Sequence, residues 1–249
     1  MINIKEQHHL RGSHLVDFLN TQFRANEGKD LSVDLSYHRL SIDTLSRISF
    51  ALRDRTVKEL DLSFAGIDDQ GAKILSEALK MHRYINKVNL SHNRISNSGA
   101  EYLADAMQVN PRFQVDLRFN AIGPKGGEAI VRSSVKNPQI KEIDLSHNDL
   151  GDEGAAGIAN ALKQNSGSIS KLVLHNNNIG FEGDKALAQK VPEKIRIFHR
   201  IQKMNFKQYL DKNPALIILA LLFLPLLFLF SCRKYIVELE GCENRRSKA

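Results

Sequence analysis

Cysteine is scarce in this chain, and its scarcity excludes one class of fold. The 249 residues include only two cysteines, Cys232 and Cys242, and both lie near the C-terminus. Two thiols this close to one end cannot form the disulfide framework that stabilises small secreted domains. The sequence therefore indicates either a reducing compartment or a fold with no redox requirement.

An excess of acidic charge is also lacking, since 35 Lys and Arg face 28 Asp and Glu. The net charge of +7 would suggest nucleic-acid binding if it were spread over one folded surface. However, residues 30–191 hold 20 basic and 20 acidic residues, whereas residues 192–249 hold 11 and 5. The basic excess belongs to the C-terminal region, which argues against a nucleic-acid groove on the preceding part of the chain.

The stretch Ile140–Gly154, IKEIDLSHNDLGDEG, combines a short strand pattern with a bend and the start of a helix. Ile143 and Leu145 are two residues apart, so both face the same side of a strand. Asn148 follows where the chain leaves the strand, and its amide can bond backbone groups that the bend would leave unpaired. One strand and one helix cannot bury these apolar residues alone, so the unit requires copies of itself.

The copies occur at steps of 27 to 29 residues. The second leucine of each strand marks the period: Leu35, Leu62, Leu90, Leu117, Leu145 and Leu174. The asparagine position holds His38, Ala65, Asn93, Asn120, Asn148 and Asn177. A glycine follows in five repeats, at Gly71, Gly99, Gly126, Gly154 and Gly183. Columns that align over six repeats predict a solenoid. Because His38 and Ala65 replace asparagine, we expect the first two turns to be less regular.

The pattern L-x-L-x-x-N-x-L with a full helix per period resembles the ribonuclease-inhibitor type of leucine-rich repeat. The resemblance covers roughly residues 30–191 and implies an α/β solenoid, with a curved parallel sheet inside and helices outside. This class includes enzyme inhibitors, GTPase activators of the Ran type and sensor-receptor domains. Residues 1–29 are then expected to form a helical cap that begins at Ser13, because end repeats expose one face of the core.

A solenoid of this type presents columns of outward side chains on its concave face, and we select candidate partner-binding residues from them. An aromatic or imidazole column follows the strands: Tyr37, Phe64, His92, Phe119 and His147. Charged columns lie on the strands: Asp34, Glu59, Asp61, Asp116, Arg118, Glu142 and Asp144. Aromatic anchors are common at interface hot spots. The alternatives are that the aspartates only keep the face soluble and that the rings pack, half-buried, on the neighbouring bend.

No catalytic or metal-binding constellation emerges from the repeats, so the chain is predicted not to be an enzyme and to use no cofactor. Gly123–Gly127 lacks the spacing of a phosphate loop. His92 and His147 lie two strands apart, about 10 Å, which is too far for one ion. Residues 1–12 lack the long apolar core of a secretory signal peptide and are expected to be a mobile polar terminus.

The repeat pattern ends before Pro192, and residues 192–213 are expected to form a basic amphipathic helix that caps the last repeat or lies on anionic lipid. Residues 215–232, ALIILALLFLPLLFLFSC, carry no charge. A helix of this length spans about 27 Å, close to a hydrocarbon core of about 30 Å. We therefore predict a transmembrane helix at 214–232, a polar tail at 233–249 and a tail-anchored protein. Whether Cys232 is lipidated is left open.

Orientation follows from the flanking charges, since residues 192–214 hold six basic and two acidic residues, which places the repeats in the cytoplasm. The sequence thus predicts a monomeric, membrane-tethered module that binds a protein and no nucleic acid. The combination also resembles effectors that bacteria such as Legionella deliver into host cells, which would imply a host partner, for example an enzyme whose active site is covered. The alternatives are a GTPase activator of the Ran type acting through Arg118, and a structural membrane protein.

Overall fold

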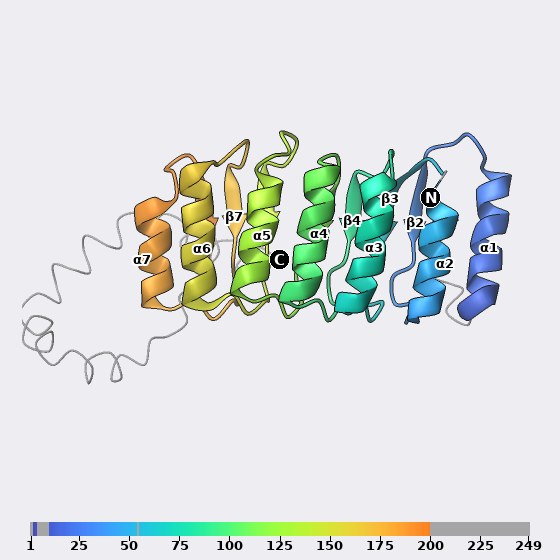
Figure 1. The fold of residues 1–249 in the computed structure, drawn as a ribbon, viewed down its shortest axis with the longest axis horizontal. Coiled ribbons are helices and arrows are strands. Elements are labelled where there is room, and N and C mark those ends of the chain that lie inside the picture. The colour runs from blue at the N-terminus through green and yellow to red at the C-terminus, as the bar shows by residue number, and fades with distance from the viewer. Residues whose placement is uncertain (1, 4–9, 54, 200–249) are drawn as a thin grey trace, which may run out of the picture. The chain divides into compact units, whose positions relative to one another are not determined.

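The computed structural model describes residues 2–3, 10–53 and 55–199, in which strands and helices alternate (Figure 1). The strands are β1 (Ile2–Asn3), β2 (Leu31–Asp34), β3 (Val57–Asp61), β4 (Lys87–Asn89), β5 (Gln114–Asp116), β6 (Glu142–Asp144), β7 (Lys171–Val173) and β8 (Arg196–Phe198). The helices are α1 (Gly12–Ala25), α2 (Ile42–Leu52), α3 (Asp69–Met81), α4 (Asn97–Val109), α5 (Pro124–Ser134), α6 (Gly151–Gln164) and α7 (Phe181–Lys190). Each predicted repeat therefore contributes one strand and one helix.

All strand pairs are parallel, and each strand pairs with the next one in sequence except β5, which does not pair with β6. The helices lie side by side in chain order in a layer on one face of the strands (Figure 1). This arrangement confirms the predicted α/β architecture of parallel strands and helices. Parallel neighbours require a crossover between them, and here the helix of each repeat supplies it.

The sheet is interrupted once within the described residues. Strands β1 to β5 form one sheet and β6 to β8 form another. Bends continue the connection, because Phe119 N–H donates to the Ser146 carbonyl (3.1 Å) and Asn120 N–H to the His147 carbonyl (3.2 Å). The helix-side contact also differs here. At three other junctions, a side chain at the start of one helix accepts a backbone N–H from the start of the next helix, and these side chains are Asp69, Asn97 and Asp152. The equivalent residue of α5 is Pro124, which has no side-chain acceptor for α6.

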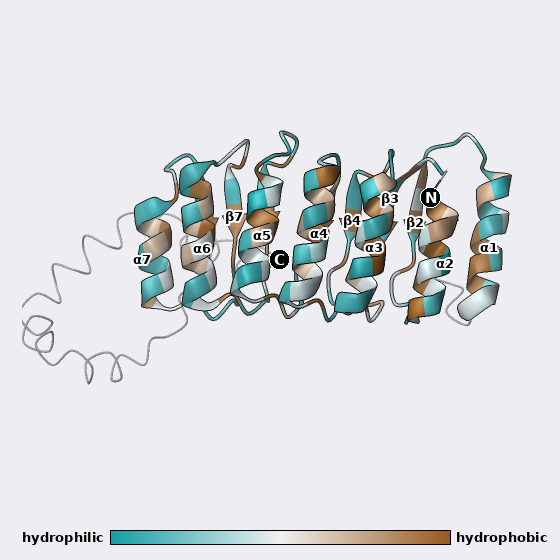
Figure 2. Ribbon diagram, in the orientation of Figure 1, coloured by the Kyte–Doolittle hydropathy of each residue, from teal (hydrophilic) through white to brown (hydrophobic). Residues whose placement is uncertain are grey.

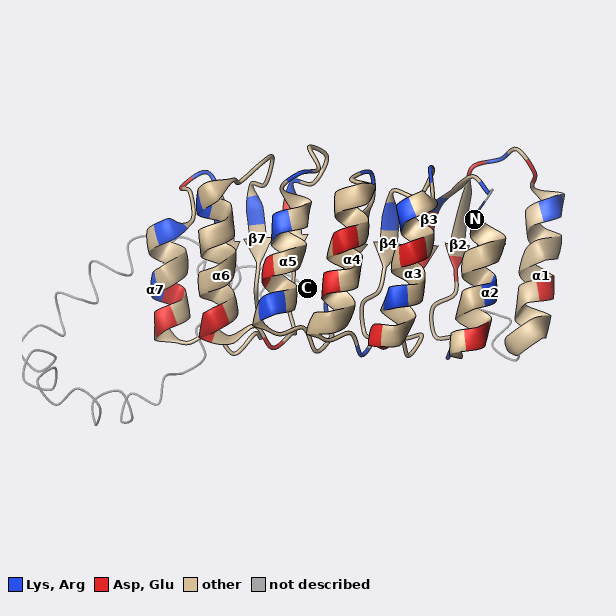
Figure 3. Cartoon of the chain, in the orientation of Figure 1, with Lys and Arg blue, Asp and Glu red and all other residues tan. Residues whose placement is uncertain are grey.

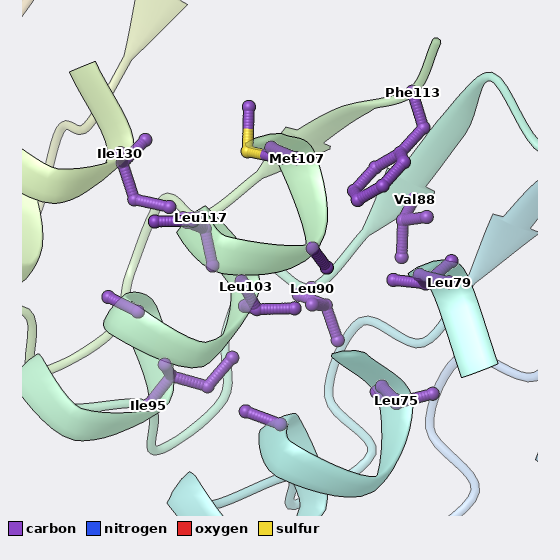
Figure 4. Packing of buried hydrophobic residues seen from close by; sticks show 14 of the residues in the cluster. Leu75, Leu79, Val88, Leu90, Ile95, Leu103, Met107, Phe113, Leu117 and Ile130 are labelled. Atoms are coloured by element: carbon purple, nitrogen blue, oxygen red, sulfur yellow. The ribbon is translucent and has the colours of Figure 1, made fainter. Parts of the chain in front are cut away.

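The core runs between the strands and the helix layer as one continuous cluster. Hydrophobic and hydrophilic residues alternate around each helix (Figure 2), which is the pattern of a helix with one buried face. In the middle of the stack, Phe113 lies beside Val88 and Leu79, and Leu103 and Leu117 fill the adjoining space (Figure 4). All five are buried, so each repeat buries its apolar face against the next.

The asparagines of the repeat behave as the sequence predicted. Asn148 is buried, accepts from Ile122 N–H (3.0 Å) and donates to the Leu117 and Leu145 carbonyls (3.0 and 3.1 Å). Asn93, Asn120 and Asn177 make the same set of bonds in their repeats. Each amide therefore joins two successive turns.

The prediction that the first two turns are less regular is confirmed for the strands, where the pairing of β2 with β3 shifts register between Leu31 and Ser32, but it is wrong for the bends. Tyr37 and Phe64, beside His38 and Ala65, have φ values of 63° and 56°, close to those of the later turns. Leu40 N–H donates to the Ala65 carbonyl (3.0 Å), which replaces the missing asparagine side chain. The turn geometry thus survives because a backbone acceptor takes over.

Three expectations at the chain ends need correction. Helix α1 begins at Gly12 with Arg11 as N-cap and no side-chain cap, so Ser13 lies inside the first turn. Within the polar terminus, Ile2–Asn3 pairs with β2. Arg196–Phe198 is a strand that pairs with β7, not the start of an amphipathic helix, because the edge of β7 offers unpaired backbone groups.

No helix in the described ranges is long and apolar enough to cross a bilayer. The segments predicted at 214–232 and 233–249, and most of 192–213, lie outside the described residues. The transmembrane helix remains a prediction from sequence.

His82, between α3 and β4, connects two repeats from a buried position. Its Nδ1 accepts the backbone N–H groups of Tyr84 (3.2 Å) and Ile85 (3.1 Å), so its Nε2 carries the proton and donates to the Leu52 carbonyl (3.1 Å). Burial lowers the pKa of His82 below its usual 6.5, partly offset by the bond to Leu52. The neutral ring is therefore the form that fits the fold.

We expect acid to destabilise the protein through His82. Its pKa is lowered in the folded state, so the unfolded chain binds a proton more readily, and stability falls as the pH drops from about 6.5 toward the folded-state value. Thermal unfolding followed by circular dichroism at pH 7.5 and 5.5 should show a smaller midpoint difference for His82→Gln than for the natural chain. The exposed His14→Gln change should leave that difference intact. An unchanged difference in His82→Gln would contradict this assignment.

Candidate protein-binding face

Five rings form one continuous stack where the strands end. Their centroids are 4.5 Å apart for Tyr37 and Phe64, 4.0 Å for Phe64 and His92, 4.0 Å for His92 and Phe119, and 3.7 Å for Phe119 and His147. The interplanar angles lie between 7° and 14°. We call these five residues the ring ladder. The rings of the predicted aromatic column are thus in direct contact with one another.

The ladder depends on an uncommon backbone conformation. All five ring residues have positive φ, between 56° and 63°, in the left-handed region that bulky residues seldom adopt. Each N–H donates to a carbonyl of the next repeat, as for Tyr37 to Ser63 (2.9 Å) and His147 to His175 (2.8 Å). Since these bonds set the backbone spacing near that of strands, about 4.8 Å, successive rings come into contact.

The aspartates of the strand column prepare this turn. Asp34, Asp61 and Asp144 each accept the backbone N–H of the serine two residues later, at 3.0, 2.8 and 2.9 Å. Such side-chain-to-backbone bonds end a strand and start a turn. Asn89 does the same for Ser91 (3.0 Å). The column thus has a structural role, and the serines that follow Asp34, Asp61, Asn89 and Asp144 are buried rather than outward.

The rings remain accessible despite their mutual contact. Tyr37 is 58% exposed, Phe64 41% and Phe119 38%, and the two histidines are half-buried. Because stacking covers the ring faces, the ladder offers mainly ring edges, which carry the positive end of the aromatic quadrupole. The rings therefore pack on their neighbours, as one interpretation of the sequence expected, and their edges face solvent, while partner binding stays a prediction.

The outer charged column is paired across strands. Glu59 forms an ion pair with Lys87 (3.3 Å), and Glu142 with Lys171 (2.8 Å). These partners stand directly opposite in the strand register. Lysines of the next repeat thus pair with both glutamates of this column. The outer column is therefore neutral over these two pairs, whereas the strand column keeps the carboxylates of Asp61, Asp116 and Asp144 on the same face.

Arg118 and Asp116 form a bidentate pair. The Nη2–Oδ2 distance is 2.6 Å, and Nε lies 3.0 Å from Oδ1. Hydrogen bonding to Asp116 raises the pKa of Arg118 above its usual value, so it stays charged. The guanidinium is engaged by its own repeat, and an arginine held this way is not extended toward a partner's nucleotide.

The strand face adjoins the ring ladder and contains a depression. A shallow depression of about 190 Å³ lies over β2, β3 and β4 and is lined by Ser32, Asp34, Glu59, Asp61, Lys87 and Asn89. Asp34 is only 8% exposed, so it contributes little surface. Among the described residues, no group of His, Cys, Asp and Glu is placed to hold a metal ion.

Asn176, the sixth residue of the ring column, belongs to this face but is not among the predicted binding residues. Its Nδ2 lies 3.0 Å from His147 Nε2, and its φ is 53°. It therefore extends the ladder into the sixth repeat with an amide in place of a ring. Its alignment with His147 in the repeat column was the available signal, but an aromatic filter excludes it.

A family model described as Leucine Rich repeat matches residues 53–76, 82–104, 114–131 and 136–159. The chain is 31% identical over 168 residues to NACHT, LRR and PYD domains-containing protein 14 of Mus musculus, which covers 64% of this chain and 17% of that protein. It is 33% identical over 133 residues to Protein NLRC5 of Homo sapiens, which covers 53% and 7% respectively. The chain thus contains leucine-rich repeats but spans less than a fifth of these relatives.

Among solved structures, the chain is similar to Leiomodin-1 Actin-Binding Site 2, with 18% identity and a TM-score of 0.39 over 80% of this chain and 95% of that one. A tropomodulin C-terminal domain from Caenorhabditis elegans is similar at 14% identity and a TM-score of 0.39, over 72% and 92%.

Proposed function

We propose that this chain is a non-catalytic protein-interaction module that binds a partner protein through the ring ladder and the adjoining strand face. One observation carries the proposal: five stacked rings, three of them over a third exposed, lie in one row beside strands whose outer glutamates are ion-paired. A soluble surface with no partner gains little from exposing large rings in a row. Leucine-rich repeats, which the chain contains, build extended binding surfaces of this kind.

The ladder also suggests the kind of contact. Its ring faces are covered, so a partner meets ring edges and approaches with apolar groups or carbonyl oxygens rather than with cations over ring faces. The ring positions are fixed by backbone bonds between repeats. Because the rings are already ordered, binding costs little side-chain entropy, which favours affinity.

The proposal includes a membrane tether at 214–232, supported by the uncharged run of residues 215–232. A tether concentrates the module at one membrane surface, with the repeats in the cytoplasm and the chain monomeric. We further propose the ribonuclease-inhibitor type of repeat, on the period and the helix in each repeat. The effector role, with inhibition of a covered enzyme, rests on resemblance alone. No observation favours the Ran-type activator or the purely structural protein over this proposal.

The test replaces two ladder rings by the residue that the sixth turn already uses at this position. Phe64→Asn with Phe119→Asn removes all four ring contacts, and Asn tolerates positive φ, as Asn176 shows. We expect the affinity for a partner identified by affinity purification and mass spectrometry to fall at least about thirtyfold, the effect of losing roughly 2 kcal/mol at a hot spot.

The matched control is Phe50→Asn with Phe181→Asn, which removes two exposed rings from the helix layer. The control should bind like the natural chain, and both variants should keep the natural circular dichroism spectrum. Equal affinity of the ladder variant and the natural chain would refute the ladder as the binding site.

A further inference from the structure

The two edges of the repeat stack differ in charge. Because all strands are parallel, the helices share one direction, and their C-terminal ends meet at a common edge. We call this the basic edge: residues 78–86, 106–113, 131–141 and 161–170, which lead from α3, α4, α5 and α6 to the next strands. They contain no Asp or Glu, and their basic residues are Lys80, Arg83, Arg112, Arg132, Lys136, Lys141 and Lys163. Lys80 and Arg132 pair with Glu77 and Glu128 of their own helices, and the basic character does not extend to the end of α1, which Glu27 and Asp30 follow.

The opposite edge is acidic. The first turns of α2, α3, α6 and α7 carry Asp43, Asp69, Asp152, Glu153, Glu182 and Asp184, and these helix starts show red in Figure 3, whereas the start of α5 carries Lys125. Helix dipoles favour this polarity near helix ends. They explain Lys80, Arg132 and Lys163, but not Arg83, Arg112, Lys136 and Lys141, which lie beyond the helices.

The same edge exposes the most accessible apolar side chains of the described chain. Phe50 is 72% exposed, Met81 68% and Val109 64%. Phe50 lies in the last turn of α2, and Met81 and Val109 are the final residues of α3 and α4. Tyr84, 42% exposed, follows Met81 with Lys58 Nζ 5.4 Å from its ring centroid. Exposed apolar side chains from successive repeats thus lie between basic side chains.

We propose that the basic edge docks on an anionic lipid surface, with Met81, Val109 and, from the adjoining end of α2, Phe50 entering the headgroup region. Separate apolar tips among basic residues suit a fluid interface, where basic groups meet anionic headgroups and apolar tips insert shallowly. The chain's own C-terminal region does not fit, because residues 192–249 carry a net charge of +6. This proposal rests on the proposed tether, which would hold the chain close to lipid. The uncharged run begins at residue 215, and the described body ends at residue 199.

Docking in this way orients the binding face. The ring ladder follows the C-terminal ends of the strands, whereas the basic edge precedes their N-terminal ends. With the basic edge on lipid, the ladder faces away from the membrane. The two surfaces can then be occupied at the same time.

The chain contains no tryptophan, so a single introduced indole reports without background. We expect the full chain with Val109→Trp to be quenched by brominated phosphatidylcholine in vesicles that contain phosphatidylserine, and not in neutral vesicles. The matched control, Gln70→Trp in the exposed first turn of α3, should be quenched in neither. Adding Arg83→Gln, Arg112→Gln and Lys136→Gln to Val109→Trp should lower the docked-to-undocked ratio about a hundredfold, at about 1 kcal/mol per charge.

Vesicle flotation of the same samples separates this proposal from the tether. A chain that floats with neutral and anionic vesicles but shows no Val109→Trp quenching overturns the docking and leaves the tether intact. A chain that floats only with anionic vesicles and is quenched there supports the docking and overturns the tether. A blue shift on soluble polyglutamate without quenching by vesicles would assign the edge to an acidic polypeptide, and equal quenching of Gln70→Trp would overturn the docking.

Discussion

The Phe113→Ala variant should lose about 3–5 kcal/mol of its free energy of unfolding, the range for a buried phenylalanine replaced by alanine. Phe113 is fully buried at the start of β5 and packs beside Val88 and Leu79 between the strands and the helix layer (Figure 4). Backbone bonds on both sides of this site hold the repeats at fixed spacing. The cavity therefore cannot close by collapse, which places the expected loss in the upper part of the range.

Urea unfolding of the chain in mild detergent, followed by circular dichroism, measures this loss. Phe50→Ala is the matched control, because it removes the same ring from a site that is 72% exposed and should change stability by less than about 0.5 kcal/mol. If both variants lost the same free energy, Phe113 would not be the packing centre that the structure describes.

The Asn148→Ala variant should be destabilised by about 1–3 kcal/mol. The change leaves the Ile122 N–H without its acceptor and removes one of two amide donors from each of the Leu117 and Leu145 carbonyls, which keep those of Asn120 and Asn177. A buried polar group left unpaired costs about 1–3 kcal/mol, and water entering the bend recovers part of this cost. The loss affects two repeats at once, because the amide bridges them.

The control for Asn148 is Asn160→Ala on the exposed side of α6, which should leave stability unchanged within about 0.5 kcal/mol. A second comparison is Asn148→Asp, which keeps the acceptor for Ile122 N–H and removes the donors. We expect the natural chain and Asn160→Ala to unfold at similar urea concentrations and both Asn148 variants to unfold at lower ones. A midpoint for Asn148→Ala equal to that of Asn160→Ala would contradict the bridging role.

Sequence periodicity predicted the repeats because it records burial directly. The leucines of the strands and the asparagine of the bend follow from side-chain spacing and hydrogen-bonding capacity, which are local properties. Positive φ at Phe64 and Phe119 could not be predicted in this way, since bulky residues disfavour that region. Bonds between repeats impose it, and the stack of rings follows from those bonds.

At the C-terminal end, the sequence pattern predicted a helix where the structure has a strand. Ile197 and Phe198 fit a helical face in sequence, yet Arg196–Phe198 is a strand on the edge of β7. A three-residue strand has too little sequence to show a period of two, so the neighbouring edge decides its conformation. Asp69 and Asp152 likewise act across repeats, and a residue's role toward the next repeat is invisible within its own.

The interruption between β5 and β6 divides the stack into two mechanical blocks. At this junction Pro124 replaces the carboxamide or carboxylate that joins other repeats. The links that remain are the packing of α5 against α6, the bends, Asn148 and the contact of Phe119 with His147. A chain stretched from its two ends would yield first at this seam. The closest ring contact of the ladder, between Phe119 and His147, crosses this junction. A partner bound across it would therefore hold the two blocks together.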